Sequence, residues 1–138
     1  MSVQLPVGVV VVTHGHLAVE FVNAAEAIVG DLGGIEAVSI GWHDDVEQAR
    51  VEIGQAIGRV ATPLGTLVLT DMFGGTPSNL AVTFLVPDRV EVVTGVNLPM
   101  LLKLATLHRA DSLREVARTV REHGQDAVWL ASELLEKR

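Results

Sequence analysis

Residues 7–12 read Val-Gly-Val-Val-Val-Val, and this run restricts the possible folds more than any other segment of the 138-residue chain. Valine favours strands, and a strand that is apolar at nearly every position is buried on both faces. The polar triplet Thr13-His14-Gly15 ends the run, and a helical pattern follows over residues 16–29. A doubly buried strand followed directly by a helix predicts a parallel sheet with helices on both faces.

The same alternation continues along the chain. Further strands are predicted at residues 35–40, 66–70 and 90–94, and a short strand-like segment at residues 127–130. Together with the helices between them, they predict one α/β domain over residues 1–138. Its open, doubly wound sheet would have four parallel strands in the order 2-1-3-4.

The predicted helices begin at recognisable capping residues. Thr76, followed by Pro77, is a hydroxyl cap with proline at the first helical position, and Asn97 opens a helix that runs to about residue 107. Asp44 or Asp45 caps a helix over residues 46–60, and Asp111 or Ser112 caps one that begins at residue 113. The inward face of the first helix is predicted to consist of Leu17, Phe21, Ala24, Ala25 and Ile28.

Composition excludes several classes of function. The net charge is −7 and no basic run occurs, which argues against nucleic-acid binding. The chain has no cysteine, so disulfides, thiolate metal sites and a cysteine nucleophile are excluded. No signal peptide is visible in residues 1–6, and no apolar stretch reaches the ~18–20 residues of a membrane span. We therefore expect a cytoplasmic protein that reaches a membrane only through a partner.

Two polar side chains follow strands that should be neighbours. In the order 2-1-3-4, strand order reverses between the first and third strands, and ligands bind at that point beyond the carboxyl ends. His14 follows the first strand and Asp71 the third, so we expect both in one crevice. A neutral imidazole is a nucleophile near pH 7, and a carboxylate on one ring nitrogen would fix the tautomer and support the charge that develops.

The segment after Asp71 suits an anion. Gly74 and Gly75 allow backbone amides to approach a phosphoryl group, and Thr76 adds a hydroxyl at the start of a helix. The loops contain no lysine or arginine, which disfavours nucleoside triphosphate binding and suits a group that must be released again. Each feature also has a purely structural interpretation, as a turn or a cap; their joint position at strand ends favours function.

The other histidines are weaker candidates. His16 is interpreted as an exposed residue at a helix start and His43 as a solvated loop residue, while His108 and His123 lie near helix ends. A zinc site has no spaced ligand pair to support it, so no metal or other cofactor is expected. A receiver-type domain phosphorylated on Asp71 is disfavoured, because no acidic pair follows the first strand to hold magnesium.

Three short motifs resemble the IIA domain of the mannose–fructose–sorbose phosphotransferase family. They are Val-Thr13-His14-Gly15-x-x-Ala18, Thr70-Asp71-x-x-Gly74-Gly75-Thr76-Pro77-x-Asn79, and Gly95-Val96-Asn97-x-Pro99-Met100-Leu101. The resemblance covers nearly the whole chain, in the expected order after strands one, three and four. It implies a phosphotransferase that carries the phosphoryl group on His14, with Asp71 orienting the ring.

The resemblance implies further roles and partners. Thr76, in place of the family's frequent serine, would help Gly74 and Gly75 hold the phosphoryl group, and Thr13 and Asn97 would support the site. Phospho-HPr would be the donor and a histidine on a separate IIB component the acceptor. Homodimers are implied, in which a C-terminal strand, matched here by residues 127–130, runs antiparallel in the partner's sheet.

Two other functions stay open at the level of sequence. A regulator that binds another protein according to its phosphorylation state would use the same His14. The phosphotransfer subunit of dihydroxyacetone kinase is the nearest rival, but its third-strand loop reads Asp-Leu-Gly-Ser, unlike the segment after Asp71 here. The sugar is not determined, because a IIA carrier does not touch it.

Overall fold

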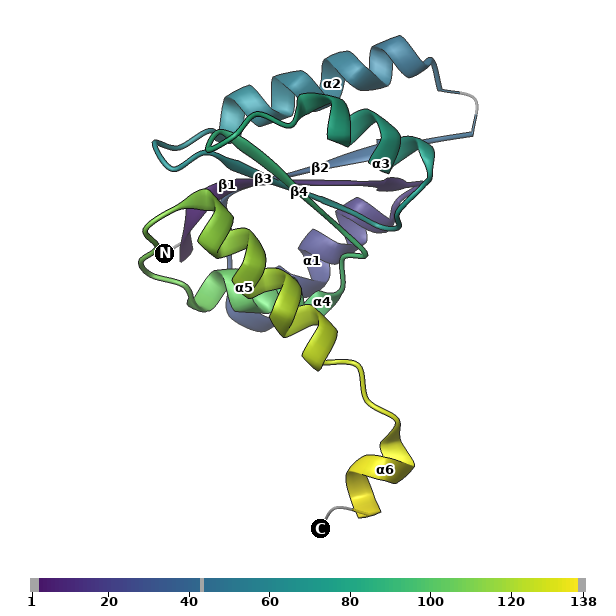
Figure 1. Ribbon diagram of the computed structural model, residues 1–138. Coiled ribbons are helices and arrows are strands. Elements are labelled where there is room, and N and C mark those ends of the chain that lie inside the picture. The colour runs from purple at the N-terminus through teal and green to yellow at the C-terminus, as the bar shows by residue number, and fades with distance from the viewer. Residues whose placement is uncertain (1–2, 43, 137–138) are drawn as a thin grey trace.

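A parallel sheet lies between two layers of helices in the computed structural model, which describes residues 3–42 and 44–136 (Figure 1). The strands are β1 (Val3–His14), β2 (Leu32–Ile40), β3 (Thr66–Thr70) and β4 (Val90–Thr94). They pair in parallel in the order β2-β1-β3-β4, which confirms the predicted sheet. His43 lies outside the described residues.

Helices cover both faces of the sheet, as predicted. On one face lie α2 (Val46–Val60), α3 (Thr76–Ala81) and the short 3-10 turn η1 (Val82–Phe84). On the other face lie α1 (Leu17–Val29), α4 (Leu98–Thr106) and α5 (Leu113–Asp126). Within residues 3–42 and 44–136, no helix combines the length and apolar character that a membrane crossing requires.

The valine run of β1 separates two cores. Val7, Val9 and Val11 belong to the core shared with α1, α4 and α5, whereas Val10 and Val12 belong to the core under α2 and α3. All five valines are fully buried, because successive side chains of a strand point to opposite faces. The strand is longer than predicted and ends at His14, beyond the last buried position.

The predicted face of α1 was partly wrong. Ala18 and Ala25 are buried, with Phe21 and Val22 packed against the core, whereas Ala24 is exposed and Leu17 and Ile28 are 51% and 60% exposed. The rotation of the helix is set at its start, where Ala18 N donates to Thr13 Oγ1 (2.7 Å). Because Thr13 is buried at the end of β1, this bond turns Ala18 inward and leaves Leu17 at the surface.

One other local prediction was wrong, and one is left untested by a single chain. Gly75 precedes the first residue of α3 and Thr76 lies inside the first turn, so Thr76 is not the cap. Residues 127–130 form no strand within the described chain: Ala127 ends α5, and an irregular segment leads to α6 (Ala131–Glu136), which extends away from the domain (Figure 1). A strand needs a neighbouring strand for its hydrogen bonds, and this chain supplies none there, so the strand expected in a partner's sheet stays a prediction.

Candidate active site

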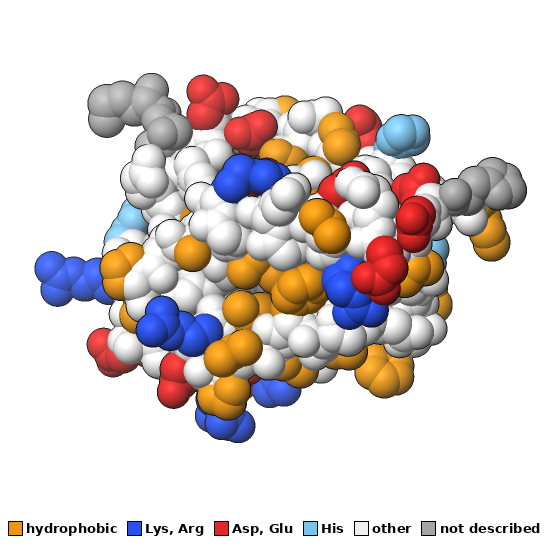
Figure 2. Space-filling model, turned by 90° about the horizontal axis from the view of Figure 1, so that it is seen from above, with side chains coloured by type: hydrophobic (Ala, Val, Ile, Leu, Met, Phe, Trp, Pro, Cys, Tyr) orange, Lys and Arg blue, Asp and Glu red, His pale blue; other side chains and the backbone are white. Residues whose placement is uncertain are grey.

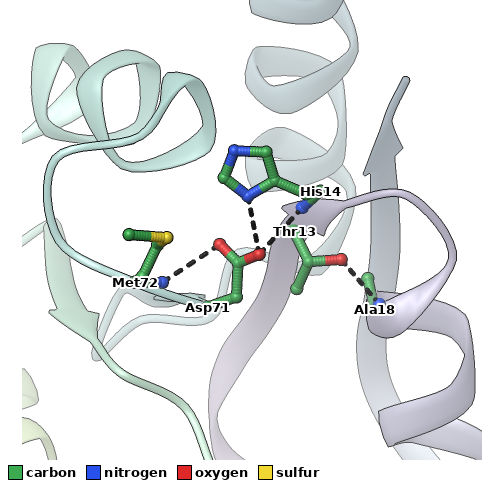
Figure 3. Close-up of polar contacts among 5 residues, drawn as sticks. All are labelled: Thr13, His14, Ala18, Asp71 and Met72. Atoms are coloured by element: carbon green, nitrogen blue, oxygen red, sulfur yellow. Dashed lines mark hydrogen bonds and ion pairs between the residues drawn. The ribbon is translucent and has the colours of Figure 1, made fainter. Parts of the chain in front are cut away.

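The carboxyl ends of β1 and β3 bring His14 and Asp71 together. The two strands are neighbours, with Val12 opposite Thr70, so the residues that follow reach the same edge of the sheet. His14 Nδ1 lies 2.8 Å from Asp71 Oδ2, and the same oxygen accepts a hydrogen bond from the His14 backbone N–H at 3.0 Å (Figure 3). The structure therefore places both predicted residues in one site.

Asp71 is itself held in position. Its second oxygen, Oδ1, accepts a hydrogen bond from the Met72 backbone N–H at 3.0 Å (Figure 3). The carboxylate side chain is 12% exposed, whereas the side chain of His14 is 46% exposed. An acid with both oxygens engaged thus lies beneath an imidazole that is open to solvent.

This geometry defines the tautomer of His14. An ionised carboxylate can only accept hydrogen bonds, so the ring nitrogen that faces it must carry the proton. Nδ1 is that nitrogen, and the lone pair of the neutral ring then resides on Nε2, which points away from Asp71 (Figure 3). The arrangement presents an uncharged nucleophilic nitrogen at the surface and keeps a negative charge behind it.

Gly75 lies against the nucleophilic edge of the ring. A Cβ at this position would be 2.6 Å from His14 Cε1 and 3.0 Å from His14 Nε2. The backbone at Gly75 therefore borders the space in front of Nε2, and the next residue, Thr76, is exposed at the start of α3. Because only glycine lacks a side chain, it is the residue that lets a group bonded to Nε2 sit beside this backbone.

The side chains of Thr13 and Asn97 form hydrogen bonds with backbone groups of the fold. Thr13 is fully buried, and its hydroxyl oxygen accepts from Ala18 N, as described above. Asn97 Oδ1 accepts from Met100 N (3.1 Å) as the cap of α4, and its Nδ2 donates to Gly124 O (2.9 Å) in α5. Both amide atoms of Asn97 are used, so its contribution is to position the segment after β4.

The turn between β1 and α1 is tied to the end of β2. Gly15 has φ +53°, a left-handed conformation that glycine adopts without strain, and its N–H donates to Ile40 O at 2.9 Å. Ile40 is also the register partner of His14. Three strand ends thus meet at the site, and the loop after β2 begins directly beside the histidine.

Sequence reasoning did not single out the exposed apolar residues in the segments that follow β1, β2 and β3. Leu17, Met72 and Phe73 are 51%, 54% and 80% exposed, and Trp42, two residues beyond Ile40, is 99% exposed. One indication of them was present in the sequence: these large apolar residues occur in predicted loops and at a helix start. No group of three or more His, Cys, Asp or Glu residues that could hold a metal ion occurs among the described residues.

Comparison with known proteins points to one family. Residues 8–121 match the family described as PTS system fructose IIA component. The chain is 28% identical to the PTS system fructose-specific EIIA component of Bacillus subtilis over 132 residues, covering 95% of this chain and 90% of that protein. It is 30% identical over 131 residues to the mannose-specific EIIAB component of Escherichia coli, covering 90% of this chain and 39% of that longer protein.

A solved structure agrees with these matches. The mannose/sorbose-specific IIA subunit of the phosphotransferase system from Enterococcus faecalis superimposes with a TM-score of 0.81 and 28% sequence identity. The superposition covers 91% of this chain and 95% of that chain. The arrangement of sheet and helices described above is therefore shared along nearly the full length of both proteins.

Proposed function

The chain belongs to the mannose–fructose–sorbose family of IIA components of the sugar phosphotransferase system, and we propose that His14 carries the phosphoryl group in this protein. Phospho-HPr would be the donor and a histidine of a IIB component the acceptor. One observation supports the proposal above all others: the 2.8 Å contact between His14 Nδ1 and Asp71 Oδ2, which leaves Nε2 of a half-exposed side chain without a hydrogen bond to residues 3–42 and 44–136.

The transfer follows from this contact. The Nε2 lone pair attacks phosphorus, the bond from phosphorus to the donor's ring nitrogen breaks, and its electron pair returns to the donor ring. His14 keeps its Nδ1 proton and gains positive charge, which the carboxylate of Asp71 stabilises. Passing the group to IIB reverses these changes, with His14 as the leaving group.

The Gly74-Gly75-Thr76 segment would hold the phosphoryl oxygens. Phosphoryl transfer needs positioning and electrostatic support more than covalent chemistry from the protein. Backbone N–H groups and the Thr76 hydroxyl can supply hydrogen bonds, and residues 13–17 and 71–79 contain no lysine or arginine that would retain the anion. Hydrogen bonds without a lysine or arginine suit a phosphoryl group that must be passed on.

The experiment is phosphate incorporation from phosphoenolpyruvate through enzyme I and HPr. We expect acid-labile, base-stable label on His14 of the wild type and no label on His14→Gln. A second step adds a IIB component and follows loss of label from this protein. An unlabelled wild type, or a labelled His14→Gln variant, would overturn the assignment; label that IIB cannot remove would favour a regulatory role.

We also propose that two copies exchange their C-terminal segments. Val128, Trp129 and Leu130 are 59–76% exposed. The outer side of β4 borders a groove of about 880 Å³, whose lining combines apolar residues, this chain's own Val128 among them, with charged ones such as Arg114 and Arg118. Residues 127–130 of a second copy would add an antiparallel strand to β4 there and bury apolar surface on both sides. A cytoplasmic homodimer is the state that follows.

A further inference from the structure

The apolar residues of α6, which extends away from the domain, lie on one side of the helix (Figure 1). Ala131, Leu134 and Leu135 are spaced i, i+3 and i+4, and the two leucines are 42% and 64% exposed. Glu133 and Glu136 fall on the opposite side of the helix. Isolated helices shorter than roughly 12–15 residues are marginal in water, and α6 has only six residues. It therefore needs another surface to pack against.

A groove of about 340 Å³ lies beside the residues that lead into β4, and it is here called the β4-start groove. Its lining combines three charged residues with five apolar ones, which are Leu85, Val86, Pro87, Val90 and Leu113. Leu85 and Val86 are each 47% exposed, so the groove offers apolar surface to a partner. Backbone hydrogen bonds join Val86 and Val90 in both directions, at 3.0 and 3.2 Å, which fixes the shape of this surface before anything binds.

The direction of the chain leads an exchanged α6 to this groove. Asn97 Nδ2 donates to Gly124 O at 2.9 Å, which holds the end of α5 beside the carboxyl end of β4. A strand that follows α5 and pairs with the outer side of β4 must therefore run back toward Val90. At roughly 3.4 Å per residue, residues 127–130 extend about 14 Å, close to the length of the five-residue β4. An exchanged segment takes on the second copy the place that it would have on its own chain, so Ala131 arrives at the start of β4.

Charge also fits this placement. The charged residues that line the β4-start groove are Asp88, Glu91 and Arg114. Because the glutamates of α6 lie opposite its leucines, seating the leucines turns the glutamates outward, away from the two acids of the groove. Arg114 forms no ion pair within the part of the chain that the structure describes, and residues 131–136 carry acidic charge only. An exposed pair between them would contribute little, so the apolar face provides most of the binding.

We infer that α6 of a second copy docks in the β4-start groove, with Leu134 and Leu135 as its anchors. The inference rests on the proposed exchange of residues 127–130 and goes beyond it, because a four-residue strand would leave the helix face and the groove exposed. In a symmetric dimer each copy supplies one helix and one groove, so the apolar surface is buried twice. Docking of α6 thus stabilises the exchanged strand.

Substitutions on the two sides of α6 test the energetic part of the inference. Leu134→Gln combined with Leu135→Gln should raise the dimer dissociation constant at least roughly tenfold, because the apolar contacts are lost at two symmetric sites. Glu133→Gln combined with Glu136→Gln is the matched control on the opposite side, and its dissociation constant should stay within about threefold of wild type. Sedimentation equilibrium measures both.

Introduced cysteines test where α6 docks, because the chain has none of its own. When Val86→Cys is mixed with Leu134→Cys, a short bifunctional thiol reagent should link the two chains. Val51→Cys on α2 replaces Val86→Cys in the control, because Val51 is exposed to a similar extent, 49%, and this mixture should give no link. Figure 2 shows the face formed by α2 and α3, where exposed hydrophobic side chains lie among acidic and basic ones.

Three results would overturn the docking of α6 while the dimer remains. They are an unchanged dissociation constant in the leucine variant, a Leu134→Cys chain that links only to another Leu134→Cys chain, and a link that closes within one chain of the double variant Val86→Cys, Leu134→Cys. The second result would mean that the two α6 helices pack on each other. The third would mean that α6 returns to its own chain.

Other results concern the proposals beneath this one. A monomeric wild type would overturn the exchange, and the docking of α6 with it. Phosphoramidate, a small phosphoryl donor that needs no protein surface, should label His14 equally in the wild type and the α6 variants. The reason is that His14 lies at the carboxyl ends of the strands and the β4-start groove at the other end of β4. A wild type that is dimeric but takes no label on His14 would overturn the phosphoryl acceptor and leave α6 docking in place.

Discussion

The α-carbon of Gly75 faces the nucleophilic edge of His14 so closely that a methyl group would lie 3.0 Å from Nε2 and 2.6 Å from Cε1. The φ of Gly75 is −94°, so alanine is compatible with the backbone. We expect Gly75→Ala to fold and to lose at least roughly tenfold in phosphorylation rate, because the ring is displaced or the approach of phosphorus is blocked. Labelling with phosphoramidate and a thermal melt measure both effects.

Gly58→Ala is the matched control for that variant. Gly58 lies within α2, and a Cβ there would meet nothing within 4 Å. Alanine in a helix interior is more stable than glycine by roughly 0.5–1 kcal/mol, so Tm should rise slightly while phosphorylation stays unchanged. Equal phosphorylation rates for Gly75→Ala and Gly58→Ala would show that the space in front of Nε2 is not used.

Asp71→Asn should slow transfer while the protein remains folded. The Asn side chain has one carbonyl oxygen, whereas Asp71 accepts from His14 through Oδ2 and from Met72 through Oδ1. One N–H must therefore face an amide nitrogen, and the charge that supports the phosphorylated ring is lost. We expect a rate at least roughly tenfold lower and a stability loss of about 1–3 kcal/mol, measured by phosphate labelling and urea unfolding. Wild-type transfer in Asp71→Asn would remove Asp71 from the mechanism.

Thr13→Val tests the bond that orients α1. The substitution keeps the shape of the buried side chain but leaves the Ala18 N–H without its acceptor, at a cost of about 1–2 kcal/mol in unfolding free energy. Thr70→Val is the comparison, because Thr70 is equally buried and its hydroxyl oxygen has no partner within the described residues. Thr70→Val should be neutral or stabilising in the same denaturant titration, and similar losses for both variants would contradict the assigned bond.

Asn97→Ala should affect stability more than transfer. It removes the cap of α4 and the bond to Gly124 O, which together contribute about 2 kcal/mol. Ser112→Ala removes one cap bond, to Glu115 N, and should cost about 1 kcal/mol. Chemical unfolding compares the two variants. If Asn97→Ala abolished labelling of a still-folded protein, Asn97 would have to act on the phosphoryl group directly.

Trp129→Asp should convert the proposed dimer into a monomer. The substitution removes the large apolar side chain at this 59% exposed position, and a carboxylate would lose its hydration on the apolar part of the groove beside β4 of a second copy. Sedimentation at micromolar concentration measures the change, with Val51→Asp on the exposed side of α2 as the control. A wild type that sediments as a monomer, or a Trp129→Asp variant that sediments as a dimer, would contradict the exchange.

The sequence by itself determined the four parallel strands and, once the order 2-1-3-4 is assumed, where the two site residues meet. The valine run of residues 7–12 is typical of a strand buried between two layers of helices, and the alternation that follows predicts parallel strands, which the structure has in the order 2-1-3-4. Once β1 and β3 are neighbours, His14 and Asp71 reach the same edge. The strands and the positions of these two residues can be predicted because they depend on hydrophobic periodicity, a property of the sequence itself.

The tertiary structure alone decided the details that depend on neighbours. The apolar residues of α1 fit more than one rotation of the helix, and the structure has the rotation in which Ala18 N also donates to Thr13 Oγ1. The closeness of Gly75 to Nε2 arises from the packing of two loops distant in sequence. Residues 127–130 have the composition of a strand, yet a strand requires a hydrogen-bonding neighbour, and in this chain they extend from the domain without one.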